Sequence, residues 1–191
     1  MPELPTTPRG TATSRRILDA AAGEFAERGI AGARIDRIIA AARTNKAQLY
    51  GYFGSKDGLF DAVMADCLDR AASDVPFDAN DLAGWAVSLY DAYLHHPGLV
   101  RLMAWARLER RPAGFVLDFD PEPKRAAVAR AQAAGRVRPG DPFDLLTLVA
   151  AMAYAWSPAS GVYAAAADEP AASHDRRRTL LRDCVQRAVA P

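Results

Sequence analysis

The chain has 191 residues, of which half are hydrophobic and a quarter are charged, enough to bury the core of one large or two small domains. Its formal charge of +1 hides an asymmetry: residues 1–56 hold nine Lys and Arg against five Asp and Glu, whereas residues 57–191 hold fifteen against eighteen. A positive N-terminal part on an acidic body indicates a protein that meets a polyanion at one end only.

Composition also argues against a membrane or secreted protein. The longest apolar run, residues 145–156, is twelve residues long and too short to span a bilayer. Residues 1–10 contain three prolines and no apolar segment, so we predict a disordered leader and not a signal peptide. We therefore expect a cytoplasmic protein without membrane contact. Cys67 and Cys184 have no Cys or His at metal spacing and are expected to be buried, reduced thiols.

Pro and Gly divide the chain into alanine-rich segments with helical spacing, and no segment alternates as a half-buried strand does. We predict an all-α protein: an N-terminal helix-turn-helix domain of three helices, residues 11–54, joined to a helical C-terminal domain, residues 55–191. The predicted helices span residues 12–28, 34–41, 45–52, 55–73, 79–96, 98–110, 122–135, 142–157 and 171–189.

Residues 34–60 hold two helix-sized segments joined by a tight turn, the signature of a helix-turn-helix. Asn45 suits the N-cap of the second helix, and Gln48 is placed to reach back to it as in a capping box. Leu49 and Phe53 form the buried side of that helix. The remaining faces carry a cation, an amide and two phenols, groups that can contact the major groove of DNA.

Four motifs extend this pattern over residues 14–63: RRILDAAAGEFAERG, IDRIIAAA, NKAQLYGYF and SKDGLFDAV. In this order they resemble the DNA-binding domain of the TetR family of transcriptional regulators. Residues 96–110 and 141–160 look like the ligand-binding domain of one subgroup of that family. The resemblance implies a homodimer that binds double-stranded operator DNA, most simply as a repressor, and releases it when a small molecule binds the C-terminal domain.

The chain departs from the family pattern around the turn. Ala33 and Arg34 stand where a Thr pair usually caps the second helix, so that cap is expected to be lost and Arg34 to contact a phosphate. Arg43 stands where the turn usually has Gly, which costs about 1 kcal/mol if its φ is positive. Gly58 replaces the acid that would complete a capping box with Ser55. These changes bear on the turn geometry and therefore on the docking angle.

The family pattern and the two helix starts predict phosphate contacts from Lys46, Tyr52 and Lys56, with Arg34 as a further candidate. Gln48 is expected to read base edges, because an amide can pair with adenine, although capping would occupy the same amide. The full predicted DNA-binding set is Arg34, Arg43, Thr44, Asn45, Lys46, Ala47, Gln48, Tyr50, Tyr52 and Lys56.

The C-terminal domain gathers large aromatic and Met side chains on helices that are expected to pack together, and such side chains suit an apolar ligand. Core packing alone is the alternative, and the family resemblance favours a ligand site. The predicted ligand-binding set is Met64, Leu68, Trp85, Leu89, Tyr93, Met103, Trp105, Met152, Tyr154 and Trp156. The fourth helix, residues 55–73, is expected to couple this site to the DNA-binding domain.

Helices 142–157 and 171–189 are the predicted dimer interface. The first is apolar nearly all round, and the second has an apolar face opposite five arginines. Two such helices from each subunit would form a four-helix bundle whose two-fold symmetry matches a palindromic operator. The alternative is that both helices only complete the monomer core. The three arginines at 176–178 are interpreted as a solvated helix start.

An enzymatic reading has little support. His95 and His96 are adjacent, so on a helix their side chains diverge by about 100° and do not easily ligate one metal. His174 is interpreted as a surface residue at a helix start. We predict no catalytic residue, metal or cofactor. Two alternatives stay open: a helical ligand-binding or scaffold protein with a degenerate head, and an all-α enzyme that uses His95 or His96.

Overall fold

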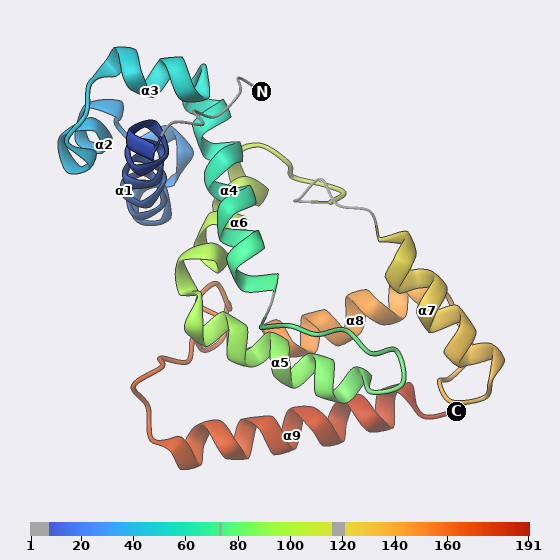
Figure 1. Ribbon diagram of the computed structural model, residues 1–191. Coiled ribbons are helices and arrows are strands. Elements are labelled where there is room, and N and C mark those ends of the chain that lie inside the picture. Colours follow the sequence, from blue (N-terminus) through green and yellow to red (C-terminus); the bar gives the residue numbers. More distant parts are fainter. Residues whose placement is uncertain (1–7, 73, 116–120) are drawn as a thin grey trace. The chain divides into compact units, whose positions relative to one another are not determined.

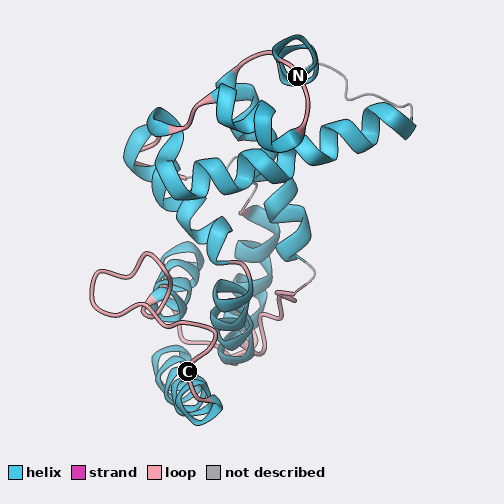
Figure 2. Ribbon diagram, turned by 90° about the vertical axis from the view of Figure 1, so that its left-hand side faces the viewer, coloured by secondary structure: helices cyan, strands magenta, loops and turns pink. Residues whose placement is uncertain are grey.

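The computed structural model describes residues 8–72, 74–115 and 121–191, which form helices and loops without a strand (Figures 1 and 2). The helices are α1 (Pro8–Gly32), α2 (Ile35–Ala42), α3 (Lys46–Phe53), α4 (Lys56–Ala72), α5 (Leu82–His95), α6 (Pro97–Glu109), α7 (Glu122–Ala133), α8 (Pro142–Tyr154) and α9 (Ala171–Val189). Each lies within a few residues of a predicted helix, which confirms the all-α class. α1 differs most, because it begins at Pro8, inside the predicted leader; residues 1–7 lie outside the described part.

The described residues form two compact units. Unit 1 holds residues 8–70 and 98–115. Unit 2 holds residues 71–72, 74–97 and 121–191. Unit 1 therefore contains most of α4 and of α6 in addition to the three helices of the predicted DNA-binding domain. The boundary at residues 54 and 55 stays a prediction.

Unit 1 is built around a small apolar core. α1 contributes Ile17 and Phe25 from one helical face, and α2 and α3 add Ile38 and Leu49; all four are fully buried. The ring of Phe25 meets Phe60 of α4 edge to face, with centroids 5.3 Å apart. Burying each large apolar side chain stabilises the fold by about 1.5–3 kcal/mol, so this core fixes the positions of α2 and α3.

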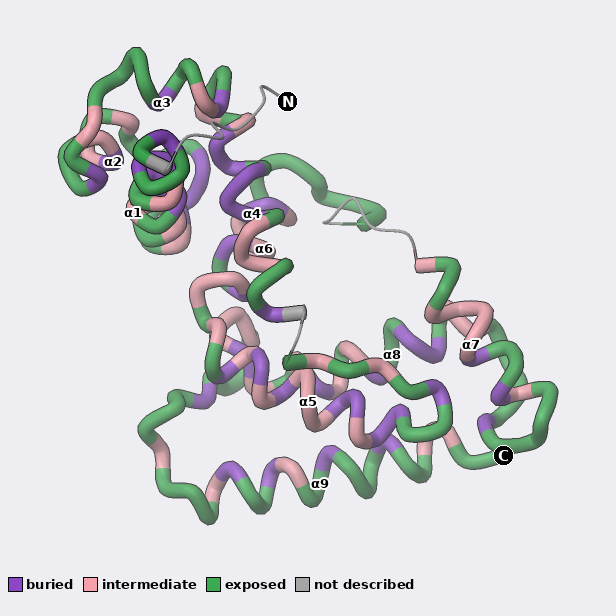
Figure 3. The backbone as a smooth tube through the Cα atoms, viewed as in Figure 1, coloured by how far each residue is buried: buried purple, intermediate pink, exposed green. Residues whose placement is uncertain are grey.

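In unit 2, α5 packs against both α8 and α9, and α7 packs against α8 (Figure 1). Tyr90 at the centre of α5 is buried, and its hydroxyl forms a 2.7 Å hydrogen bond with Nδ1 of His174 on α9. Leu181 and Val185 continue the buried stripe of α9 at helical spacing, and Figure 3 shows this alternation of buried and exposed residues along the helix. The stripe follows the face that α9 presents to α5.

The structure corrects three predictions about exposure. His174 was expected at the surface and is buried, because it shares a helical face with Leu181. Among the arginines at 176–178, Arg177 is buried and its guanidinium lies 2.6 Å from the carboxylate of Glu169. Cys184 is exposed and not buried. Tertiary packing decides the environment of these side chains, and their polarity alone does not reveal it.

Candidate nucleic-acid interface

The turn between α2 and α3 is closed by backbone hydrogen bonds around a left-handed residue. Arg43 has φ 50° and ψ 54°, and within the described residues it is the one non-glycine residue with a positive φ. Its N–H donates to the Ala40 carbonyl, and the N–H of Thr44 donates to the Ile39 carbonyl at 3.1 Å, the pattern of a Schellman motif. The turn thus keeps a conformation that suits Gly, and the Arg43 side chain costs about 1 kcal/mol there.

Asn45 caps α3, as its position predicts. Its Oδ1 accepts from the backbone N–H of Gln48 at 2.9 Å. Gln48 reaches back toward the turn, but its Oε1 accepts from the hydroxyl of Thr44 at 2.7 Å, so the predicted capping box is replaced by a bond between side chains. The amide nitrogen of Gln48 makes no hydrogen bond within the described residues and can donate to a base edge.

α3 packs one face on unit 1 and presents the others to solvent. Leu49 and Phe53 are buried, as predicted. Tyr52 is half-buried, with its ring edge to face with that of Phe53. The exposed residues are Lys46, Ala47, Gln48, Tyr50 and Gly51. The helix therefore offers a cation, an amide and a phenol from a rigidly packed support.

Two of the cations predicted to contact phosphates have weak partners in the free protein. Lys46 Nζ lies 2.8 Å from the Asp36 carboxylate, which raises the pKa of Lys46. Lys56 Nζ donates to the carbonyl of Ala31 at 3.2 Å. Arg34 is exposed. Because exposed pairs of this kind contribute little, a phosphate can replace these partners.

α2 lacks a side-chain cap at Arg34, as the loss of the Thr pair predicts, and α1 supplies a substitute. Oε1 of Glu24 accepts from the backbone N–H of Arg34 at 2.9 Å and from Nε of Arg37 at 2.7 Å. These bonds, chiefly that from Arg37, lower the pKa of Glu24. The sequence reasoning missed Glu24, because its partners are ten or more residues away and no local pattern links them.

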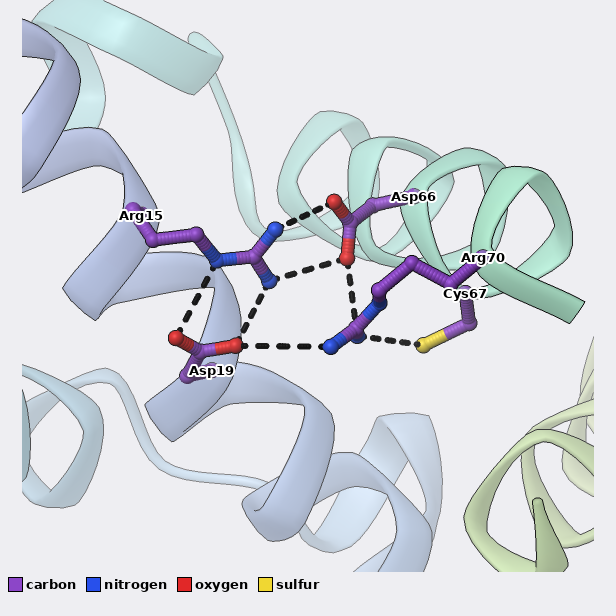
Figure 4. A network of polar contacts seen from close by, with 5 residues as sticks. All are labelled: Arg15, Asp19, Asp66, Cys67 and Arg70. Atoms are coloured by element: carbon purple, nitrogen blue, oxygen red, sulfur yellow. Dashed lines mark hydrogen bonds and ion pairs between the residues drawn. The ribbon is translucent and has the colours of Figure 1, made fainter. Parts of the chain in front are cut away.

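A cluster of ion pairs that was also missed ties α4 to α1 (Figure 4). Arg15 pairs with Asp19, one turn further along α1, and with Asp66 on α4. Nη2 of Arg70 lies 2.8 Å from Asp66 and 3.4 Å from Sγ of Cys67. The Arg15 guanidinium lowers the pKa of Asp66, and burial raises the pKa of the Cys67 thiol. A movement of α4 would therefore act directly on α1.

α6 reaches the end of α1 around Gly29. Nε1 of Trp105 donates to the Ala26 carbonyl at 3.3 Å, and Oε2 of Glu109 accepts from the N–H of Ala31 at 2.7 Å. Gly29 has φ 72°, and a Cβ there would lie 2.9 Å from the Trp105 ring and 2.5 Å from the Glu109 carboxylate. Glycine alone suits both the backbone conformation and these contacts.

The residues predicted to bind a ligand divide between the two units. Met64, Leu68, Met103 and Trp105 belong to unit 1; Trp85, Leu89, Tyr93, Met152, Tyr154 and Trp156 belong to unit 2. In unit 2 the rings of Tyr93 and Tyr154 meet edge to face at 5.6 Å, and burial raises the pKa of Tyr93 to about 12. Tyr93 is thus a neutral phenol at neutral pH. The role of these residues as ligand contacts stays a prediction.

Other features of unit 2 lie outside the predicted ligand-binding set. A surface hollow of about 230 Å³ lies between the end of α7 and the start of α8, lined in part by Gln132, Asp141 and Leu148. His96 Nε2 lies 2.7 Å from the Asp74 carboxylate.

Within the described ranges, no three His, Cys, Asp or Glu side chains are grouped as metal ligands. No helix in those ranges is long and apolar enough to cross a membrane.

Comparisons with known proteins agree with this geometry. Residues 17–63 match the family described as bacterial regulatory proteins, tetR family, and residues 81–187 match the tetracyclin repressor-like C-terminal domain. Over 147 residues the chain is 42% identical to the HTH-type transcriptional repressor SCO4008 of Streptomyces coelicolor, an alignment that covers 74% of this chain and 77% of that protein. Over 105 residues it is 31% identical to the repressor NicS of Pseudomonas putida, covering 51% and 50%.

Solved structures give the same result. The crystal structure of SCO4942 from Streptomyces coelicolor matches with a TM-score of 0.80 and 37% identity, covering 93% of this chain and 98% of that one. A TetR family regulator from Pseudomonas syringae shares the fold, with a TM-score of 0.69 and 24% identity over 92% and 95% of the chains. Members of this family bind operator DNA, dimerise and bind small-molecule ligands. The chain belongs to the TetR family of DNA-binding transcriptional regulators.

Proposed function

We propose that this protein is a homodimeric repressor that binds a palindromic operator through α3 and releases it when a small, mostly apolar molecule binds. Residues 11–54 bind DNA, and residues 55–191 bind the effector and dimerise. No catalytic role is assigned to His95 or His96, and the protein acts on chromosomal DNA in the cytoplasm. The observation that carries the proposal is α3 itself, which is capped by Asn45 and exposes Lys46, Gln48 and Tyr50.

Phosphate contacts come from Lys46 and Lys56, with Tyr52 and Arg34 beside them. Both lysines lie at the first residue of a helix, where backbone N–H groups also point toward an anion. DNA binding exchanges the contact of Lys46 with Asp36 for a phosphate. Each phosphate neutralised in this way releases counterions, so the binding constant depends on salt.

Gln48 reads the base edges. Thr44, Ala47 and Tyr50 lie near it in the motif, and Arg43 lies in the turn before them. The bond from the Thr44 hydroxyl holds the Gln48 side chain at the start of α3 before DNA arrives. A bidentate contact to adenine uses both the oxygen and the nitrogen of the amide. Thr44 therefore positions Gln48 in the free protein and yields its bond when the base is bound.

The dimer interface is assigned to α8 and α9. Leu148 on α8 and Leu180 on α9 remain about half exposed within unit 2, at 50% and 52%, and Cys184 lies one turn beyond Leu180. The other apolar residues of α9, such as Leu181, face α5. A two-fold pairing of α8 and α9 with the same helices of a second subunit would cover the exposed leucines.

Operator binding is the first test. Selection of bound DNA from a random pool should yield an inverted repeat, and fluorescence anisotropy then gives its affinity against salt. Lys46→Ala should weaken binding to all sequences alike and reduce the salt slope by about 0.9, whereas Arg130→Ala, an exposed cation on α7, should change neither. A Lys46→Ala protein with unchanged affinity and slope would contradict the docking, and no selected sequence at all would favour the degenerate head.

Gln48→Ala separates base readout from capping. Loss of readout should relax the preference at one base pair in each half-site, worth about 1–3 kcal/mol of discrimination. An unchanged motif with a lower melting temperature would assign Gln48 to the helix start alone.

Release requires that the effector bind the DNA-incompetent state more tightly, and a coupling of about 1–3 kcal/mol is typical. α4 is the proposed lever, because Ser55 and Lys56 lie at its start, Met64 and Leu68 further along, and Asp66 holds Arg15 of α1. A molecule that binds tightly and leaves operator affinity unchanged would contradict this mechanism.

A further inference from the structure

Lys124 lies in a setting within unit 2 that the proposed function does not use. Its Nζ is 5.5 Å from the ring centroid of Phe77 and 5.4 Å from that of Trp85. The two rings meet edge to face, with centroids 5.2 Å apart and planes at 87°. The ammonium therefore lies over two perpendicular aromatic faces, both of which attract a cation.

Within the described part of the chain, this ammonium has no anionic partner. None of the ion pairs within the described residues includes Lys124, and burial alone lowers the pKa of its half-buried amine. Aromatic faces offset part of the cost of removing a cation from water, but they supply no counter-charge. The protein thus keeps a partly desolvated positive charge that an incoming anion would neutralise.

The position of Lys124 in its helix also favours a bound anion. It lies in the first turn of α7, whose N-cap, Pro121, gives no side-chain hydrogen bond. A helix N-terminus carries partial positive charge, which repels a lysine and attracts an anion. The same turn holds one carboxylate, that of Glu122, which pairs with Arg125, so Lys124 is the charge of that turn that has no ion pair among the described residues and can bind a further anion.

Trp85 supplies an independent observation. Trp85 is only 7% exposed. Its indole N–H is buried as well, but it has no hydrogen-bond acceptor within the described residues. Buried Trp N–H groups usually have a hydrogen-bond partner. Within the described residues, the Lys124 ammonium thus lacks an anionic partner and the Trp85 N–H lacks a hydrogen-bond acceptor, and both groups belong to the same aromatic cluster.

We infer that Phe77, Trp85 and Lys124 form a binding site for a small carboxylic acid with a flat apolar body. Its carboxylate pairs with Lys124 at the start of α7 and accepts from the Trp85 N–H, while its apolar body lies against Phe77, which is half-buried. A cation would be repelled by Lys124, and a neutral molecule would leave the ammonium unpaired. The inference rests on the proposed function, in which this domain binds the effector, and narrows the effector to an apolar anion.

The test follows the indole of Trp85 in the full-length protein. The chain has three tryptophans, so Trp105→Phe with Trp156→Phe leaves Trp85 as the sole indole. The ¹⁵N-labelled N–H resonance is titrated with 3-phenylpropionate, its neutral amide 3-phenylpropionamide and the cation 3-phenylpropylamine. We expect a saturable shift with the carboxylate, binding of the amide roughly tenfold weaker, and no saturable shift with the amine.

Lys124→Gln should remove the preference for the carboxylate and leave the affinity for the amide unchanged. Arg130→Gln removes one charge from an exposed position on the same helix and should keep the preference. Circular dichroism confirms that each variant is folded. Equal binding of carboxylate and amide, an undiminished preference in Lys124→Gln, or no saturable shift with millimolar carboxylate would each overturn the inference.

Operator anisotropy on the parent protein, which keeps Trp105 and Trp156, separates the two proposals. If the protein binds its selected operator but not the carboxylate, the site fails and the repressor function stands. If it binds the carboxylate and no operator, the repressor function fails and the site stands.

Discussion

One ion pair from each unit shows two opposite uses of charged side chains. In unit 1, Lys46 and Asp36 pair at the surface, with side chains 58% and 74% exposed. In unit 2, Arg177 and Glu169 pair with side chains only 10% and 18% exposed. The exposed pair is hydrated and screened, so Lys46 can exchange its carboxylate for a phosphate. The buried pair cannot open without leaving an unpaired charge inside the protein, so it fixes packing instead.

The contrast predicts that damage to one core stays within its unit, and Phe25→Ala should have the largest effect. Phe25 is fully buried against Phe60, and truncation of such a side chain costs about 3–5 kcal/mol. Unit 1 should melt early and operator binding should fall. Trp105 reports unit 1 when Trp85 and Trp156 are replaced by Phe, and the reverse set reports unit 2.

Leu108→Ala is the matched control, because Leu108 is 73% exposed on α6 of the same unit and its loss should leave the melting temperature unchanged. If Phe25→Ala lowered both tryptophan melting curves equally, the units would unfold as one and the comparison would not extend to their stability.

The polar contacts buried in unit 2 come next in size. Tyr90→Phe removes the hydrogen bond to Nδ1 of His174, whose Nε2 already has no partner within the described residues. Leaving both ring nitrogens buried and unpaired should cost about 1–3 kcal/mol, measured by urea unfolding of unit 2. Tyr93→Phe removes the same atom from the same helix, where the described residues give the hydroxyl no hydrogen bond, and should cost much less. Equal losses would show that the hydroxyl of Tyr90 has no special role.

The features of unit 1 that the sequence predicts are those decided within one helical turn. The Asn45 cap, the tight turn before it and the shared helical face of Leu49 and Phe53 are set by residues at most five positions apart, whereas the sequence leaves the sign of φ at Arg43 open. Side-chain type and spacing are sufficient at this range, because helix geometry fixes which neighbours meet. The role of Glu24 as a substitute cap lies beyond that range.

Unit 2 shows where such reasoning fails. His174 is buried because its Nδ1 forms a hydrogen bond inside the core with the hydroxyl of Tyr90, 84 residues earlier in the chain. The sequence predicts one apolar face on α9, but Leu180 and Leu181 are about 100° apart on the helix, and α5 covers only Leu181. Which half of a broad apolar face meets the monomer core depends on the neighbouring helix, and the sequence of α9 alone does not contain that information.

Arg43 allows a smaller test that separates stability from DNA binding within unit 1. Arg43→Gly relieves about 1 kcal/mol of backbone strain and loses part of that gain to the freedom of Gly in the unfolded chain, for a net gain of about 0.5 kcal/mol. Arg43→Asn should also stabilise unit 1, because Asn tolerates a left-handed backbone, whereas Arg43→Ala should not. Operator affinity should fall in all three variants. Stabilisation by Ala equal to that by Gly would mean that strain is not the cause.

The smallest expected effect concerns the pH dependence of unit 2. The N–H of Ala166, the Arg177 guanidinium and the Tyr163 hydroxyl lower the pKa of Glu169 from 4.5 to about 2. Because the folded value lies below the unfolded one, this carboxylate stabilises unit 2 above about pH 4.5, and its contribution is lost as the pH falls toward 2. Glu169→Gln should therefore flatten the melting temperature of unit 2 across that window, whereas Asp168→Asn, the exposed neighbour, should leave the slope unchanged. Parallel curves for Glu169→Gln and the parent protein would mean that the buried pair contributes no more to stability than the surface pair of Lys46 and Asp36, and the contrast between the units would then be one of geometry alone.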